Sequence, residues 1–153
     1  MRRLTLALAA LAALVLAPPL LAGQATKKYD FAPANGVQEV AVEAGKVKIN
    51  QVIFKLDSRG TGFVFSTKAG DSGAKIRIDN NGDTDVEVGV AIVVFDAEGN
   101  IVGAGGGGTK AGYLKKGSRD THGVDFDYVY RNADKAKSFI ITLETKARAE
   151  EKK

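Results

Sequence analysis

Apolar and polar residues alternate with a period of two along most of the chain. The clearest case lies in residues 74–103, AKIRIDNNGDTDVEVGVAIVVFDAEGNIVG, where an apolar side chain occupies every second position of one long run: Val86, Val88, Val90, Ile92 and Val94. Residues with this spacing line one face of a β-strand. The breaks NNGD and DAEGN on either side are rich in turn-forming residues. The pattern predicts a β-meander at the centre of an all-β domain.

Two apolar runs precede this meander, VQEVAVE and KVKINQVIFKL. In the second run Val47 and Ile49 have one parity, whereas Val52 and Phe54 have the other. A β-bulge near Asn50-Gln51 would bring both sets to one face. We therefore expect a bulged strand that is buried on one side.

Four consecutive glycines, Gly105 to Gly108, follow the meander. Glycine in a strand costs chain entropy and offers no side chain to pack. We predict that the strand ends near Ala104 and that residues 105–113 form a mobile loop. Alternation then resumes with Val124 and Phe126, which indicates a second long strand.

Turn signals recur about every ten residues, a spacing typical of β-sandwiches. The sequence predicts an antiparallel immunoglobulin-like β-sandwich of about seven to nine strands, formed by residues 37–145. Residues 26–36 are polar and contain Pro33, so we expect a linker there. Residues 146–153, KARAEEKK, are expected to be a charged tail.

The N-terminus has the organisation of a secretory signal peptide. Arg2 and Arg3 precede an apolar stretch and two prolines, and small residues follow. Cleavage after Ala25 gives a signal peptide of residues 1–25 and places small residues at both recognition positions, whereas cleavage after Ala22 places Leu20 at the outer one. An uncleaved membrane anchor is the alternative. A cleaved chain is expected in the periplasm or the medium, with no membrane contact.

The segment from Lys75 to Gly117 resembles a known family. Its order of a strand, an NNGD turn, the valine strand, FDAEGNIVG and a Leu-Lys-Lys-Gly turn is similar to FxLYD-type and related immunoglobulin-like domains of bacterial secreted proteins. Lys116 stands where those domains commonly have proline. The resemblance implies the fold and leaves the function open.

Composition narrows the chemistry. The chain has no cysteine, which excludes disulfides, thiolate catalysis and the acylated cysteine of a bacterial lipoprotein. Loss of Arg2 and Arg3 from the 22 basic residues would leave 20 against 18 acidic ones. Basic and acidic residues are interleaved, so we expect no nucleic-acid partner.

Catalytic side chains are scarce. His122 is the only histidine, and its parity with Val124 and Phe126 favours a half-buried or edge position over a catalytic base. We therefore expect no enzymatic activity and no cofactor.

Asp79, Asn81, Asp83 and Asp85 alternate within seven residues and carry the oxygen ligands that calcium prefers. Their spacing differs from that of an EF-hand, and tight turns need the same residue types. We keep these four residues as calcium candidates and expect no other metal site.

Tyr113 stands near Lys110 and Lys115, beside the glycine run. An aromatic ring with flanking ammonium groups can form a contact site for a protein or glycan. The function that we predict is a non-catalytic, exported interaction module with an unidentified protein or glycan partner. The alternatives are a calcium- or glycan-binding accessory protein and, less favoured, a small hydrolase or an enzyme inhibitor.

Overall fold

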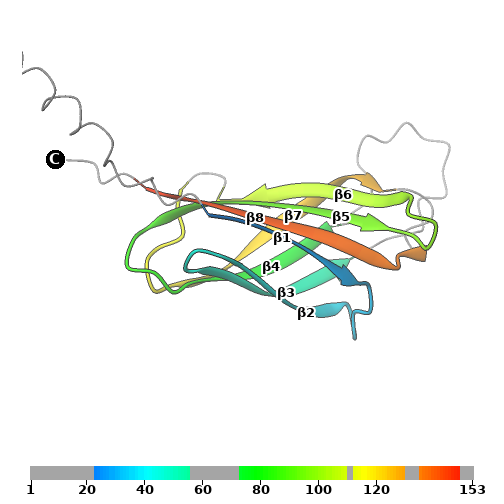
Figure 1. The fold of residues 1–153 in the computed structure, drawn as a ribbon, viewed down its shortest axis with the longest axis horizontal. Coiled ribbons are helices and arrows are strands. Elements are labelled where there is room, and N and C mark those ends of the chain that lie inside the picture. The colour runs from blue at the N-terminus through cyan, green and yellow to red at the C-terminus, as the bar shows by residue number, and fades with distance from the viewer. Residues whose placement is uncertain (1–22, 56–72, 110–111, 130–134, 149–153) are drawn as a thin grey trace, which may run out of the picture.

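The computed structural model describes residues 23–55, 73–109, 112–129 and 135–148. These described residues form eight β-strands, which Figure 1 labels. They are β1 (Gly23–Asp30), β2 (Val37–Ala44), β3 (Val47–Lys55), β4 (Gly73–Asn80), β5 (Val86–Phe95), β6 (Ile101–Gly108), β7 (Arg119–Val129) and β8 (Ser138–Ala147). Within the described ranges, no helix is long and apolar enough to cross a membrane.

All eight strands belong to one antiparallel sheet with the order β1-β8-β5-β6-β7-β4-β3-β2. The prediction of an antiparallel all-β domain is therefore confirmed. The sheet curves until its two edge strands, β1 and β2, lie near each other, so the architecture is that of a nearly closed barrel (Figure 1). The finer prediction of an immunoglobulin-like sandwich is not confirmed, because the strands form a single sheet.

Side chains close the seam between β1 and β2. Ala41 of β2 donates its backbone N–H to the hydroxyl of Tyr29, at 2.9 Å, and its carbonyl accepts from Lys27 Nζ, at 2.5 Å. Ala41 lies within a register irregularity of the β2–β3 ladder, between Glu39 and Val42. The bulge leaves its backbone groups without ladder partners, and the two β1 side chains satisfy them.

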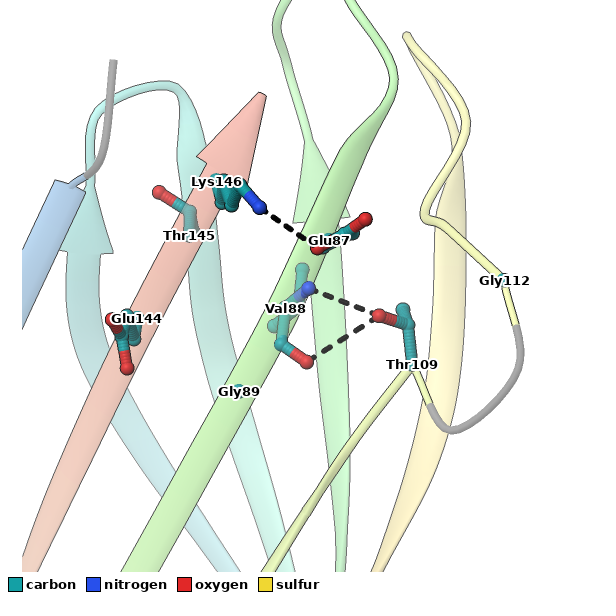
Figure 2. A pocket seen from close by; sticks show the side chains of 8 residues that line it. All are labelled: Glu87, Val88, Gly89, Thr109, Gly112, Glu144, Thr145 and Lys146. Carbon is teal, nitrogen blue, oxygen red and sulfur yellow. Dashed lines mark hydrogen bonds and ion pairs between the residues drawn. The ribbon is translucent and has the colours of Figure 1, made fainter. Parts of the chain in front are cut away.

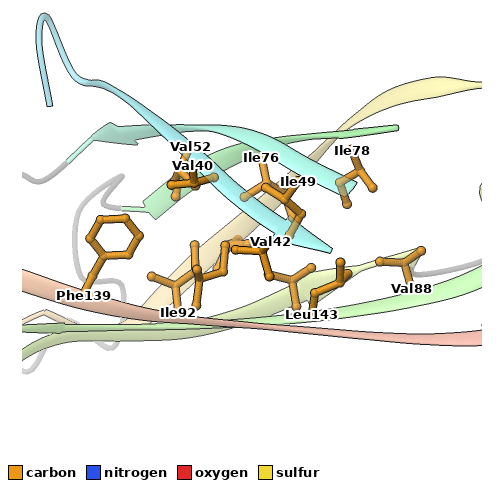
Figure 3. Close-up of a cluster of buried hydrophobic side chains, with 14 of the residues drawn as sticks. Val40, Val42, Ile49, Val52, Ile76, Ile78, Val88, Ile92, Phe139 and Leu143 are labelled. Carbon is orange, nitrogen blue, oxygen red and sulfur yellow. The ribbon is translucent and has the colours of Figure 1, made fainter. Parts of the chain in front are cut away.

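Where apolar and polar residues alternate along a strand, the apolar side chains point into the barrel. Figure 3 shows side chains of β2, β3 and β4 packed against those of β5 and β8. Val42, Ile49, Ile92, Phe139 and Leu143 are completely buried. Burial of this kind stabilises a fold by about 1.5–3 kcal/mol for each large side chain, so a continuous core compensates for the absence of disulfides.

The predicted bulge of β3 is present. The β3–β4 register shifts between Ile49 and Gln51, and residues of both parities, Val47, Ile49, Val52 and Phe54, are buried in the same core.

The prediction of a loop at the glycine run is wrong, because Gly105 to Gly108 are the second half of strand β6. A Cβ on Gly105 would lie 2.0 Å from the carbonyl oxygen of Asp125, and the Phe126 ring covers both Gly103 and Gly105. Glycine lets the β6 backbone approach β7 this closely, and the aromatic ring supplies the missing packing.

The expected linker at residues 26–36 is also wrong in its first half. Strand β1 begins at Gly23 and pairs with β8 along its whole length. Tyr29 stacks on Phe139, with ring centroids 5.4 Å apart, and Phe31 packs edge-on against Phe54, at 4.9 Å. These aromatic contacts anchor a polar segment whose alternation is too weak to predict a strand.

Candidate functional site

Asn80 organises one end of the barrel. Its side chain is 1% exposed, and Nδ2 donates to the carbonyls of Thr84, Leu114 and Lys115 at 2.9, 3.2 and 3.2 Å. Its Oδ1 accepts from the backbone N–H of Gly82 at 3.0 Å, the hydrogen bond of an Asx-turn. Asn80 thereby joins the β4–β5 turn to the segment that precedes β7.

The neighbouring Asp79 lies on the opposite face of β4. Its carboxylate accepts from Arg119 Nε and from an Arg119 terminal nitrogen, at 2.5 and 2.9 Å, and from Asn50 Nδ2 at 2.7 Å. Hydrogen bonding to the Arg119 guanidinium holds the pKa of Asp79 below its ordinary value, although partial burial opposes this shift. Arg119 and Asp79 thus form a bidentate ion pair that joins β4 to β7.

A groove of about 460 Å³ lies beside this end, on the outer face of β5 and β8 (Figure 2). Strand residues form its floor, and Thr109 and Gly112, which follow β6, form one wall. The lining residues are Glu87, Val88, Gly89, Thr109, Gly112, Glu144, Thr145 and Lys146.

The groove exists because Gly89 has no side chain. Gly89 belongs to the outward-facing set of β5 and pairs with Glu144 of β8 and Gly108 of β6. A Cβ on Gly89 would have Glu144 Cβ as its nearest neighbour, at 3.9 Å, so the space above it is open. Any larger side chain at this position would project into the groove.

Hydrogen bonds fix the wall of the groove to its floor. Thr109 Oγ1 accepts from the backbone N–H of Val88, at 3.0 Å, and the Thr109 N–H donates to the Val88 carbonyl, also at 3.0 Å. At one end Lys146 Nζ lies 4.0 Å from a carboxylate oxygen of Glu87. Both of these side chains are more than half exposed, so the ion pair is accessible to an incoming charged group.

The four calcium candidates are not brought together as a ligand set. Asp79 is bound to Arg119, and Asp85 Oδ1 accepts from the backbone N–H of Lys116 at 2.9 Å. Asn81 and Asp83 are exposed. In the part of the chain that the structure describes, no three His, Cys, Asp or Glu side chains form a group that could hold a metal ion.

The contact site suggested at Lys110, Tyr113 and Lys115 stays a prediction. The Tyr113 ring is half-buried, and the Arg148 guanidinium lies 4.1 Å from its centroid, a cation–π contact with the end of β8. Lys115 is exposed, and Lys110 lies outside the described residues. Among the described residues, the structure thus adds Arg148 to the side chains that the sequence suggested near this tyrosine.

His122 lies on the face of β7 that is turned into the barrel, paired in register with the buried Ile76. Its Nε2 is buried without a hydrogen-bond partner and lies 3.7 Å from Asp120 Oδ2. Among the described residues, no hydrogen bond therefore fixes Nε2 of this imidazole.

Two residues that sequence reasoning missed, Asn80 and Gly89, shape this region. Asn80 shares the inward parity of Ile76 and Ile78, which is an available signal that its amide is buried. Gly89 interrupts the outward-facing set of β5, where a missing side chain indicates a close approach or a hollow.

No family model matches the chain, and no curated protein shows significant similarity to it. The resemblance to FxLYD-type domains therefore stays a prediction.

Proposed function

We propose that the domain is a non-catalytic binding module of an exported protein, and that it binds an extended polypeptide segment of its partner. The observation that carries this proposal is the groove over Gly89. Its volume lies within the range of about 300–1,000 Å³ that is typical of ligand sites, and it combines an open strand face with charged side chains at its rim.

Charge favours a partner segment with a basic side chain. Among the described lining residues, Glu87 and Glu144 contribute two carboxylates, against the one ammonium of Lys146. An incoming lysine or arginine can pair with Glu144 or compete with Lys146 for Glu87. Exposed pairs of this kind contribute specificity and association rate more than affinity.

The closed seam argues against strand addition as the mode of binding. Partners commonly add a strand to an exposed sheet edge. Here Lys27 and Tyr29 occupy the free backbone groups of Ala41, and a Cβ on Gly23 would lie 3.0 Å from the backbone of Ala44. The outer face is therefore the better docking surface.

Export to the periplasm or medium is part of the proposal and rests on the N-terminal sequence. The proposal also includes an immunoglobulin-like relationship to FxLYD-type domains, which is supported by the order of motifs from Lys75 to Gly117. A glycan in place of a polypeptide is an outcome that the following experiment distinguishes.

The test fills the groove while the fold is kept. A photo-cross-linking residue at Gly112, where a Cβ would meet nothing within 4 Å, reports what enters the groove in the cells that export the protein. Gly89→Tyr should reduce this cross-linking at least tenfold, and Ala91→Tyr, on the same face one pleat along β5, should leave it unchanged. Equal cross-linking in both variants would contradict the proposal, and a cross-linked glycan would replace the polypeptide as partner.

A further inference from the structure

The first three residues of β1 are integral to the sheet. Gly23, Gln24 and Ala25 pair in register with Thr145, Glu144 and Leu143 of β8. Thr145 Oγ1 also donates to the Gly23 carbonyl, at 3.4 Å. A chain that began at Thr26 would lose three rungs of this ladder and leave the corresponding edge of β8 unpaired.

These residues also close the barrel at this end. A Cβ on Gly23 would lie 3.0 Å from the Ala44 carbonyl carbon and 3.1 Å from the Gly45 nitrogen, so the β1 backbone fits directly against the β2–β3 turn. Ala25 packs against the core cluster. Ala44 and Thr145, both at most 4% exposed, would gain solvent contact if residues 23–25 were absent.

We propose that export processing hydrolyses the peptide bond between Ala22 and Gly23, so that the mature chain begins at Gly23. Water adds its hydroxyl to the Ala22 carbonyl carbon and a proton to the Gly23 nitrogen, which leaves a carboxylate on the signal peptide and an ammonium group on β1. Ala22 supplies the small residue before the cleaved bond. The mature chain then keeps all the described residues of β1, Gly23–Asp30.

This site differs from the cleavage after Ala25 that the small-residue pattern alone favours. The pattern places Leu20 at the outer recognition position of the Ala22 site, which is its one unfavourable feature. Cleavage after Ala25 satisfies the pattern but removes part of a strand. The inference rests on the proposed export, because processing at either bond requires it.

The full chain, produced in a bacterium with intact export machinery, provides the test through the intact mass of the exported protein. We expect a mature chain that begins at Gly23. A chain that begins at Thr26 overturns this inference and leaves export standing, whereas an unprocessed chain in the cytoplasm overturns both.

Two variants locate the processed bond independently of folding. Ala22→Leu removes the small residue before that bond and should reduce processing at least tenfold. Gln24→Leu changes an exposed position between the two candidate bonds and should be processed as the wild type is. Normal processing of Ala22→Leu would contradict the inference.

Discussion

Replacing Asn80 by alanine tests whether one buried amide holds the end of the barrel together. The substitution removes one acceptor and the two N–H donors that Nδ2 shares among three carbonyls. Each hydrogen bond contributes about 0.5–1.5 kcal/mol net, and a buried polar group left without a partner costs about 1–3 kcal/mol more.

The three carbonyls do not lose all their partners. The Leu114 carbonyl still accepts from Val86 N–H, at 3.0 Å, and the Lys115 carbonyl still accepts from Ser118. Thr84 is exposed, so water can reach its carbonyl. No full desolvation penalty is therefore added, and we expect Asn80→Ala to lower the free energy of unfolding by about 2 kcal/mol, which corresponds to a drop in Tm of roughly 5–10 °C.

Asn80→Asp should be more destabilising than Asn80→Ala, because it places a carboxylate where the amide N–H groups face three carbonyl oxygens in a site that is 1% exposed. Asn81→Ala is the matched control. Asn81 is the next residue of the same turn and is exposed, so we expect a change within about 0.5 kcal/mol.

The chain has no tryptophan, so urea unfolding is best followed by far-ultraviolet circular dichroism. Limited proteolysis gives a local readout, since Asn80→Ala should speed tryptic cleavage at the exposed Lys115 and Lys116. The reasoning is refuted if Asn80→Ala and Asn81→Ala unfold at the same urea concentration.

Two further predictions concern the glycine run and the ion pair. Gly105→Ala would place a Cβ 2.0 Å from a β7 carbonyl oxygen. It should lower the free energy of unfolding by about 3 kcal/mol or more, or prevent folding. In Gly106→Ala the nearest atom to the new Cβ is the Val90 carbonyl oxygen, at 3.5 Å, so the free energy of unfolding should change by less than about 1 kcal/mol in the same urea assay. Because Arg119 lowers the folded-state pKa of Asp79, the pair stabilises the fold above the unfolded-state pKa of about 3.9, and this contribution is lost as the pH falls through the lower folded-state pKa. Arg119→Gln should therefore be less stable than the wild type at pH 7, and the difference should shrink below about pH 4; a difference that is constant with pH would contradict this assignment.

The sequence correctly predicts the strands in which the spacing of apolar residues matches the face that is buried. The valine run of β5 and the bulge of β3 are found where the parity of their apolar residues places them. In both cases each local preference agrees with the tertiary contacts, which is the condition under which sequence patterns are informative.

Strands β1 and β6 could not be predicted, because tertiary contacts override their local preferences. Four glycines disfavour a strand in isolation, and only the position of the Asp125 carbonyl and the Phe126 ring explains why they form one here. β1 is polar, and it is held by pairing with β8 and by the Tyr29–Phe139 stack. Both strands depend on partners that lie far along the sequence.

The candidate site could not be predicted from the sequence for a related reason. Gly89 gives no functional signal by itself, and its importance appears only when Glu144, Thr109 and Gly112 are placed around it. The neighbouring positions on this face also carry small side chains or none: Gly108 pairs with Gly89, and Ala91 pairs with Gly106. This part of the outer face is therefore flat and consists largely of backbone. The hollow at Gly89 consequently depends on the walls around it as well as on the missing side chain at position 89. A single side chain at position 89 can therefore fill it without disturbing the core beneath, which is why Gly89→Tyr separates binding from folding.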